Sequence, residues 1–155
     1  MVMDRLYKFL VLLAIVAHAC SEPMIENCGS TADVNSVTVS GCSDSMKFCP
    51  LVRGTDVNVT IAFISNSEAK TVKAAVIGVL FGVSLSICIS QPDGCKSGIS
   101  CPIQKGQSYT YMSQLEVKKN YPLTRIIVIW ELIDDNANVL VCVKIPCELK
   151  KALHE

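Results

Sequence analysis

Cysteine content is the feature that most constrains what this chain can fold into. The chain has nine cysteines, and eight of them lie after residue 21. A secretory leader is predicted over residues 1–21, because Arg5 and Lys8 precede an apolar run that is followed by small residues. That run is too short to span a bilayer. Cleavage after Ser21 leaves an even number of cysteines, which favours a disulfide-linked secreted domain over residues 22–155.

The same region lacks the residues that most enzymes and metal sites need. Its one histidine, His154, is one residue from the C-terminus, and no Cys-x-x-Cys motif occurs. A serine or cysteine nucleophile therefore has no neighbouring base, and zinc has no ligand set. The chain has 14 basic and 14 acidic residues, so it also lacks the positive charge that nucleic acid requires. We expect no enzyme, no metal site and no nucleic-acid partner.

Hydrophobic residues recur at every second position along much of the chain. Between residues 56 and 64 the apolar side chains alternate with polar or small ones, which predicts a strand with one solvent face. Asn58, in the glycosylation motif Asn58-Val59-Thr60, falls on that solvent face. The two observations together predict a glycan at Asn58.

Further segments fit the same pattern. Residues 83–90 and 109–117 alternate, while residues 72–81 and 126–133 are apolar on both faces, which suits strands covered on both sides or an apolar lip at a cavity mouth. Residues 134–138 predict a turn before a last strand over 139–145. Short strands separated by turns predict an all-β fold, an antiparallel two-sheet sandwich.

Eight cysteines allow 105 pairings, so their spacing does not settle which of them join. Two short loops are available, from Cys42 to Cys49 and from Cys95 to Cys101. Cys28 and Cys142 would then tie the two ends of the domain together.

A set of motifs resembles the Niemann-Pick type C two sterol-transfer proteins. These belong to the lipid-recognition family of ML domains, together with mite group-two allergens and the lipid A coreceptor. The matching segments are Glu22-Pro23, Asn27-Cys28-Gly29-Ser30, residues 91–105, Tyr121-Pro122 and Trp130-Glu131-Leu132. The resemblance covers nearly all of residues 22–155. It implies an immunoglobulin-like sandwich with a lipid cavity between its sheets, the three pairings named above, and a glycan at Asn58.

Cys88 and Cys147 lie outside the three-disulfide pattern of that family. We expect them to form a fourth bridge, because unpaired thiols are uncommon in secreted proteins. The alternative is that both remain buried thiols.

The function implied by the resemblance is that of a secreted or lysosomal carrier of one sterol, which passes its cargo to a membrane or to a membrane-bound acceptor protein. We expect a monomer with no cofactor apart from the bound lipid. The resemblance places nine residues at or near the cavity: Val39, Leu51, Leu85, Ile87, Leu115, Val117, Tyr121, Val128 and Trp130. It also makes Phe81, Gly82 and Val83 an exposed apolar lip that touches a membrane or partner.

Two departures from the family keep other ligands open. Ile87 stands where the sterol proteins carry an aromatic residue, within a segment that is rich in proline in those proteins, and Glu116 stands where a proline is expected at the mouth. A softer entrance would admit fatty acids or other small hydrophobic compounds. An innate-immune lipid-recognition module is a third interpretation.

Overall fold

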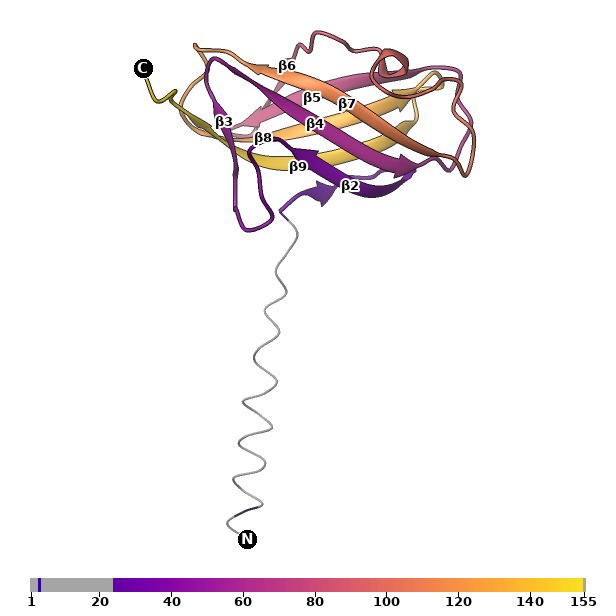
Figure 1. Cartoon of the computed structure of the whole chain (residues 1–155), viewed down its shortest axis with the longest axis horizontal. Helices are drawn as coiled ribbons and strands as arrows, with labels where there is room; N and C mark the ends of the chain where they lie inside the picture. Colours follow the sequence, from indigo (N-terminus) through magenta and orange to yellow (C-terminus); the bar gives the residue numbers. More distant parts are fainter. Residues whose placement is uncertain (1–2, 4–23, 155) are drawn as a thin grey trace.

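The computed structural model describes residue 3 and residues 24–154, so the predicted leader over residues 1–21 lies almost wholly outside the described residues. The described part folds into β-strands with one short 3-10 helix, η2 (Gly94–Lys96) (Figure 1). The strands are β1 (Glu26–Asn27), β2 (Asp33–Val39), β3 (Cys49–Val52), β4 (Thr55–Ile64), β5 (Val72–Leu80), β6 (Val83–Ile87), β7 (Ser108–Val117), β8 (Arg125–Asp134) and β9 (Val139–Lys150).

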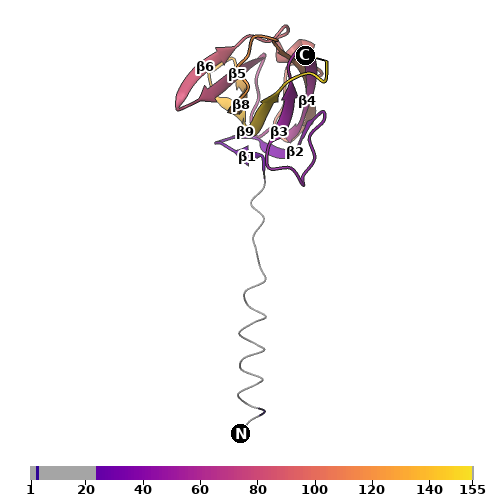
Figure 2. The same ribbon diagram turned by 90° about the vertical axis from the view of Figure 1, so that its left-hand side faces the viewer.

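The strands form two layers (Figure 2). One layer, the large sheet, has the order β1-β9-β8-β5-β6, with β3 also pairing with β9. The other layer, the small sheet, has the order β2-β4-β7. The predicted all-β sandwich is confirmed. One pairing departs from the antiparallel expectation, because β3 runs parallel to β9 with Cys49 beside Cys147.

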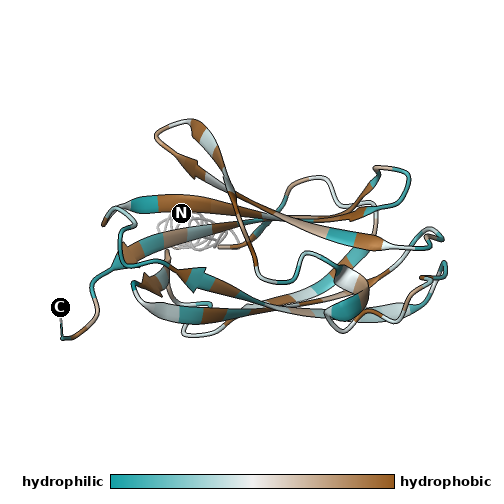
Figure 3. Ribbon diagram, turned by 90° about the horizontal axis from the view of Figure 1, so that it is seen from above, coloured by the Kyte–Doolittle hydropathy of each residue, from teal (hydrophilic) through white to brown (hydrophobic). Residues whose placement is uncertain are grey.

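Alternation along the strands sets which side chains enter the space between the layers. In β4 the side chains of Val57, Val59, Ile61 and Phe63 are buried, whereas Asn58 is exposed on the outer face of the small sheet. Hydrophobic stretches run along the strands of both layers (Figure 3). Within residues 24–154, no third layer covers the outer faces of β5 and β8, and Ile127 is 43% exposed there. Being apolar on both faces therefore does not mean that these strands are covered on both sides.

Aromatic side chains fill the middle of the core. Trp130, Tyr111 and Phe63 are the largest fully buried side chains. The rings of Tyr111 on β7 and Trp130 on β8 meet edge to face across the two sheets, with centroids 6.1 Å apart. Burial of such rings contributes more than that of any other side chain. The two sheets are therefore in direct contact at this point.

Three disulfides brace the sandwich, and they are the pairs that the family resemblance implies: Cys28–Cys142, Cys42–Cys49 and Cys95–Cys101. The predicted fourth bridge between Cys88 and Cys147 is wrong, because both cysteines are free. Cys88 follows β6 at the edge of the large sheet, and β5 and β8 lie between that edge and Cys147 on β9. Three strand spacings amount to about 14 Å, twice the reach of a disulfide.

The β5–β6 hairpin extends beyond the cover of the small sheet (Figure 2). Val83 and Leu85 belong to the inner face of β6, since they pair with Leu80 and Gly78 of β5, yet they are 59% and 52% exposed. The large sheet is wider than the small one, so none of the described strands lies opposite its edge strand β6. The sandwich is open along this edge.

Candidate functional site

A recess of about 790 Å³ lies between the segment that follows β6 and the C-terminal end of β7. We call it the β6–β7 recess. Its walls come from the turn before β4, the first residues of β4, the segment after β6 and the C-terminal end of β7. The lining residues are Gly54, Asp56, Cys88, Ile89, Ser90, Gln114, Glu116, Val117, Lys118 and Lys119.

The recess is lined mainly by polar and charged side chains, and it touches the apolar core at Val117. Asp56 and Glu116 are cross-strand neighbours on β4 and β7, and Lys118 and Lys119 follow β7 directly. Val117, which also lines the recess, is only 1% exposed and belongs to the core cluster. Such an arrangement suits an amphipathic guest, with its polar end among the charged side chains and its apolar body toward the core.

Most of the residues predicted to line a lipid cavity lie between the sheets. Six are buried in the core: Val39, Leu51, Leu115, Val117, Val128 and Trp130. Ile87 and Tyr121 are partly buried and pack against that core, whereas Leu85 is exposed on β6. Val117 is the one that also lines the recess. Their contact with a ligand stays a prediction.

Gly78 is a residue of this region that sequence reasoning missed. It is buried in β5 between Leu85 on β6 and Val128 on β8. Because glycine has no side chain, it leaves a gap on the inner face of the large sheet near the open edge. A methyl group at Gly78 would lie 2.9 Å from Ile126 Cδ1 and 3.1 Å from Ile87 Cδ1. These two side chains occupy the hollow that glycine leaves. A glycine inside a strand is the available sequence signal, because it often marks a close approach.

Two polar atoms in the core have no hydrogen-bond partner among the described residues: Tyr111 Oη and Trp130 Nε1. Burial raises the pKa of Tyr111, and the nearby side chains of Ser113 and Trp130 lower it by a smaller amount. These neighbours therefore influence Tyr111 electrostatically without meeting hydrogen-bond geometry. A buried polar group left without a partner costs about 1 to 3 kcal/mol.

The predicted lip is exposed and its backbone is strained. Phe81 and Gly82 form the two-residue turn between β5 and β6, with φ values of 49° and 76°. Such turns need positive φ at both central residues, which glycine adopts freely and phenylalanine does not. Phe81 is also 88% exposed. An exposed ring held in an unfavourable conformation suggests a role outside the fold itself.

The two free thiols have different surroundings. Cys88 is exposed and lines the β6–β7 recess. Cys147 is buried in β9, and burial raises the pKa of its thiol to about 12. Cys88 is therefore the more reactive of the two.

Residue 3 and residues 24–154 contain no cluster of three or more potential metal ligands. The same residues contain no helix with the length and apolar character needed to cross a bilayer.

Comparison with known proteins identifies the family. The family model described as ML domain matches residues 23–149. The chain belongs to the ML-domain family. NPC intracellular cholesterol transporter 2 from Sus scrofa is 42% identical over 142 residues, covering 90% of this chain and 94% of the relative. The protein of the same name from Danio rerio is 40% identical over 149 residues, covering 95% of this chain and 99% of the relative. The prediction that the chain is not an enzyme is confirmed by this membership.

Solved structures of other proteins agree with the fold. A Niemann-Pick type C2 protein from the Japanese carpenter ant superposes with a TM-score of 0.76 at 28% identity, covering 81% of this chain and 98% of that one. Chicken MD-1 complexed with lipid IVa superposes with a TM-score of 0.53 at 16% identity, covering 80% and 86%. The second likeness is one of fold alone.

Proposed function

We propose that the chain is a carrier that binds one sterol-like lipid between its two sheets. The lipid enters through the β6–β7 recess. The observation that carries this proposal is the 42% identity to a cholesterol transporter over 90% of the chain. The geometry supports it, because the recess meets the core at Val117 and the sandwich is open along the β6 edge.

The binding free energy expected for a sterol is adequate for a carrier that must also release its cargo. A sterol has about 28 heavy atoms, and at about 0.3 kcal/mol for each atom the binding free energy reaches about 8 kcal/mol, or near-micromolar affinity. Ile87 and Ile126 are the side chains to be displaced, since they fill the hollow at Gly78. Both are flexible at their ends, and Ile87 is only partly buried.

Transfer to a membrane, or to a membrane-bound acceptor protein, is assigned to the lip of Phe81, Gly82 and Val83. This apolar turn is the part of the hairpin that extends beyond the small sheet. Lys118 and Lys119 at the rim of the recess would each contribute about 1 kcal/mol on an anionic bilayer. The protein works as a secreted or lysosomal monomer, with its glycan on Asn58, on the outer face of the small sheet beside Gln114.

A fatty acid or other small hydrophobic compound is the second candidate ligand. The observation that favours it is the open inner face of β6, where Leu85 is 52% exposed and Ile87 replaces a stiffer aromatic residue. A flexible chain can follow such an entrance more easily than a rigid ring system can.

Uptake of a fluorescent sterol by the delipidated protein tests the proposal. We expect saturable binding at one site, and a strong reduction in Val117→Phe. Val139→Phe, a change of equal size at the start of β9, is the control that should bind normally. Val117 is buried, so its replacement could also disturb folding. A second, independent test therefore attaches a bulky maleimide to Cys88 in the folded wild-type protein, which should also reduce uptake. Uptake unchanged by both modifications would remove the β6–β7 recess from the route.

A further inference from the structure

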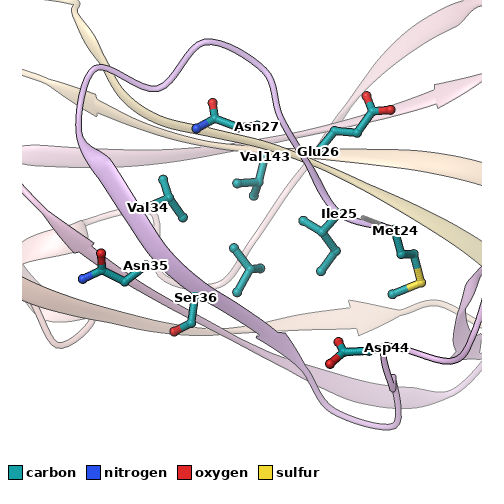
Figure 4. Close-up of a pocket in the computed structure, with 10 residues that line it drawn as sticks. Met24, Ile25, Glu26, Asn27, Val34, Asn35, Ser36, Asp44 and Val143 are labelled. Carbon is teal, nitrogen blue, oxygen red and sulfur yellow. The ribbon is translucent and has the colours of Figure 1, made fainter. Parts of the chain in front are cut away.

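A second recess lies on the opposite side of the sandwich, where β1 and β2 form the other two sheet edges. We call it the β1–β2 groove; its volume is about 370 Å³. It is drawn in Figure 4. The lining residues are Met24, Ile25, Glu26, Asn27, Val34, Asn35, Ser36, Val37, Asp44 and Val143.

The interior of the groove is apolar. Met24, Ile25 and Val34 point into the space between the two chain segments, and Val143 lies at its base (Figure 4). Val143 is 2% exposed and part of the core, whereas the other apolar lining residues are only partly buried. Apolar side chains that are half covered on a concave surface gain further burial when an apolar guest enters.

Covalent and hydrogen-bonding contacts hold the walls of the groove in place. The Cys28–Cys142 disulfide anchors the chain just after β1. Ser30 Oγ donates to the Cys142 carbonyl at 3.2 Å and accepts from the Cys142 amide at 2.8 Å. In β2 the register shifts between Val34 and Ser36, as in a β-bulge, which redirects the side chains at that point. The groove is therefore formed before any ligand arrives.

The rim determines which head group fits. Glu26 and Asp44 contribute carboxylates, while Asn27, Asn35 and Ser36 contribute amides and a hydroxyl. Lysine and arginine are absent from the lining residues of this groove. An anionic head group would be repelled, whereas an uncharged hydroxyl or an ammonium group would find acceptors.

The volume determines which tail fits. A methylene group needs about 30 Å³, similar to the share of one water molecule in the liquid. The groove then holds a single chain of about twelve carbons and is at the small end of the range for ligand pockets. A sterol, with about 28 heavy atoms, exceeds it.

We propose that the β1–β2 groove is a second ligand site, which takes one medium-length alkyl chain with an uncharged or cationic head, such as a fatty alcohol or an alkylamine. The site is separate from the β6–β7 recess and does not depend on sterol binding.

Three twelve-carbon probes test it by titration calorimetry and methyl NMR: 1-dodecanol, dodecylammonium and dodecanoate. We expect the first two to bind and to shift the methyl signals of Val34 and Val37, and dodecanoate to bind about tenfold more weakly. Asp44→Lys leaves one carboxylate, Glu26, against one new ammonium group at the rim, so it should abolish the difference in affinity between the two charged probes. Asp44 is exposed and outside every strand, so this variant keeps the fold. Glu68→Lys, at an exposed carboxylate outside the groove, is the matched control and should leave the order unchanged.

Competition with sterol separates this proposal from the proposed function. Bound sterol should leave dodecanol binding unchanged; one-for-one displacement would place the alcohol in the sterol site and overturn the proposal. No binding of dodecanol up to its solubility limit, or an Asp44→Lys variant that keeps the wild-type order, would also overturn it. Binding in the groove by a protein that takes up no sterol would support the second site while refuting the sterol carrier.

Discussion

Removing the Cys28–Cys142 disulfide should destabilise this protein more than removing any short-loop disulfide. The bond joins residues 114 positions apart and anchors the two-residue strand β1 against β9. The matched comparison is Cys95–Cys101, which joins residues 6 positions apart. Each bridge is removed by changing both cysteines to alanine, so that no new free thiol remains.

The size of the effect follows from the entropy of the unfolded chain. A cross-link removes loop-closure entropy in proportion to the logarithm of the loop length. For loops of these lengths the relation gives about 5 kcal/mol for Cys28–Cys142 and about 2 kcal/mol for Cys95–Cys101. The difference of about 3 kcal/mol is large compared with the 5 to 15 kcal/mol that a domain of this kind has in total.

Urea unfolding of the non-reduced variants, followed by Trp130 fluorescence, measures both losses. With slopes of about 1 to 3 kcal/mol per molar urea, the two midpoints should differ by about 1 to 3 M. Equal losses in the two variants would show that local strain or contacts, rather than loop length, set the contribution of each bridge. A change in slope would show that the denatured state had changed as well.

Three further predictions concern single side chains. Iodoacetamide at pH 8 should label Cys88 and spare Cys147, because a pKa of about 12 leaves about one Cys147 thiol in ten thousand ionised; a Cys88–Cys147 peptide in a non-reducing digest would contradict this. Tyr111→Phe removes a buried hydroxyl that has no hydrogen-bond partner, so it should leave the free energy of unfolding unchanged or raise it by up to about 1 kcal/mol in the same urea assay. Tyr109→Phe removes a hydroxyl that accepts a hydrogen bond from a backbone amide at 2.7 Å, so it should lower the free energy of unfolding by about 1 kcal/mol. Phe81→Ala should slow sterol transfer between vesicles about tenfold with little change in binding, and a parallel loss of both would place Phe81 in the pocket instead.

The sequence predicts the strands that have a sustained alternating or apolar pattern and misses those that are short or interrupted. β4 and β7 are recognisable because buried and exposed side chains alternate along ten residues. β2 is not, since the register shift between Val34 and Ser36 interrupts its period of two. β3 has only four residues and includes Pro50, and its parallel pairing with β9 depends on the path of the preceding loop.

The site shows the same division. Alternation and resemblance place Val117, Val128 and Trp130 in the space between the sheets, and the structure agrees. The even number of cysteines led us to predict a fourth bridge, which is wrong. The number of cysteines does not show that two strands, β5 and β8, separate Cys88 from Cys147. The β1–β2 groove was not foreseeable, since it joins edges of two sheets that are set by topology.

Native mass spectrometry of the delipidated protein mixed with cholesterol tests the central claim most directly. We expect one bound sterol for each chain, retained in wild type and lost when Cys88 carries a bulky maleimide. We also expect slower alkylation of Cys88 when the sterol is present. Absence of any sterol adduct from the folded, disulfide-intact protein would contradict the claim that its two sheets enclose a lipid.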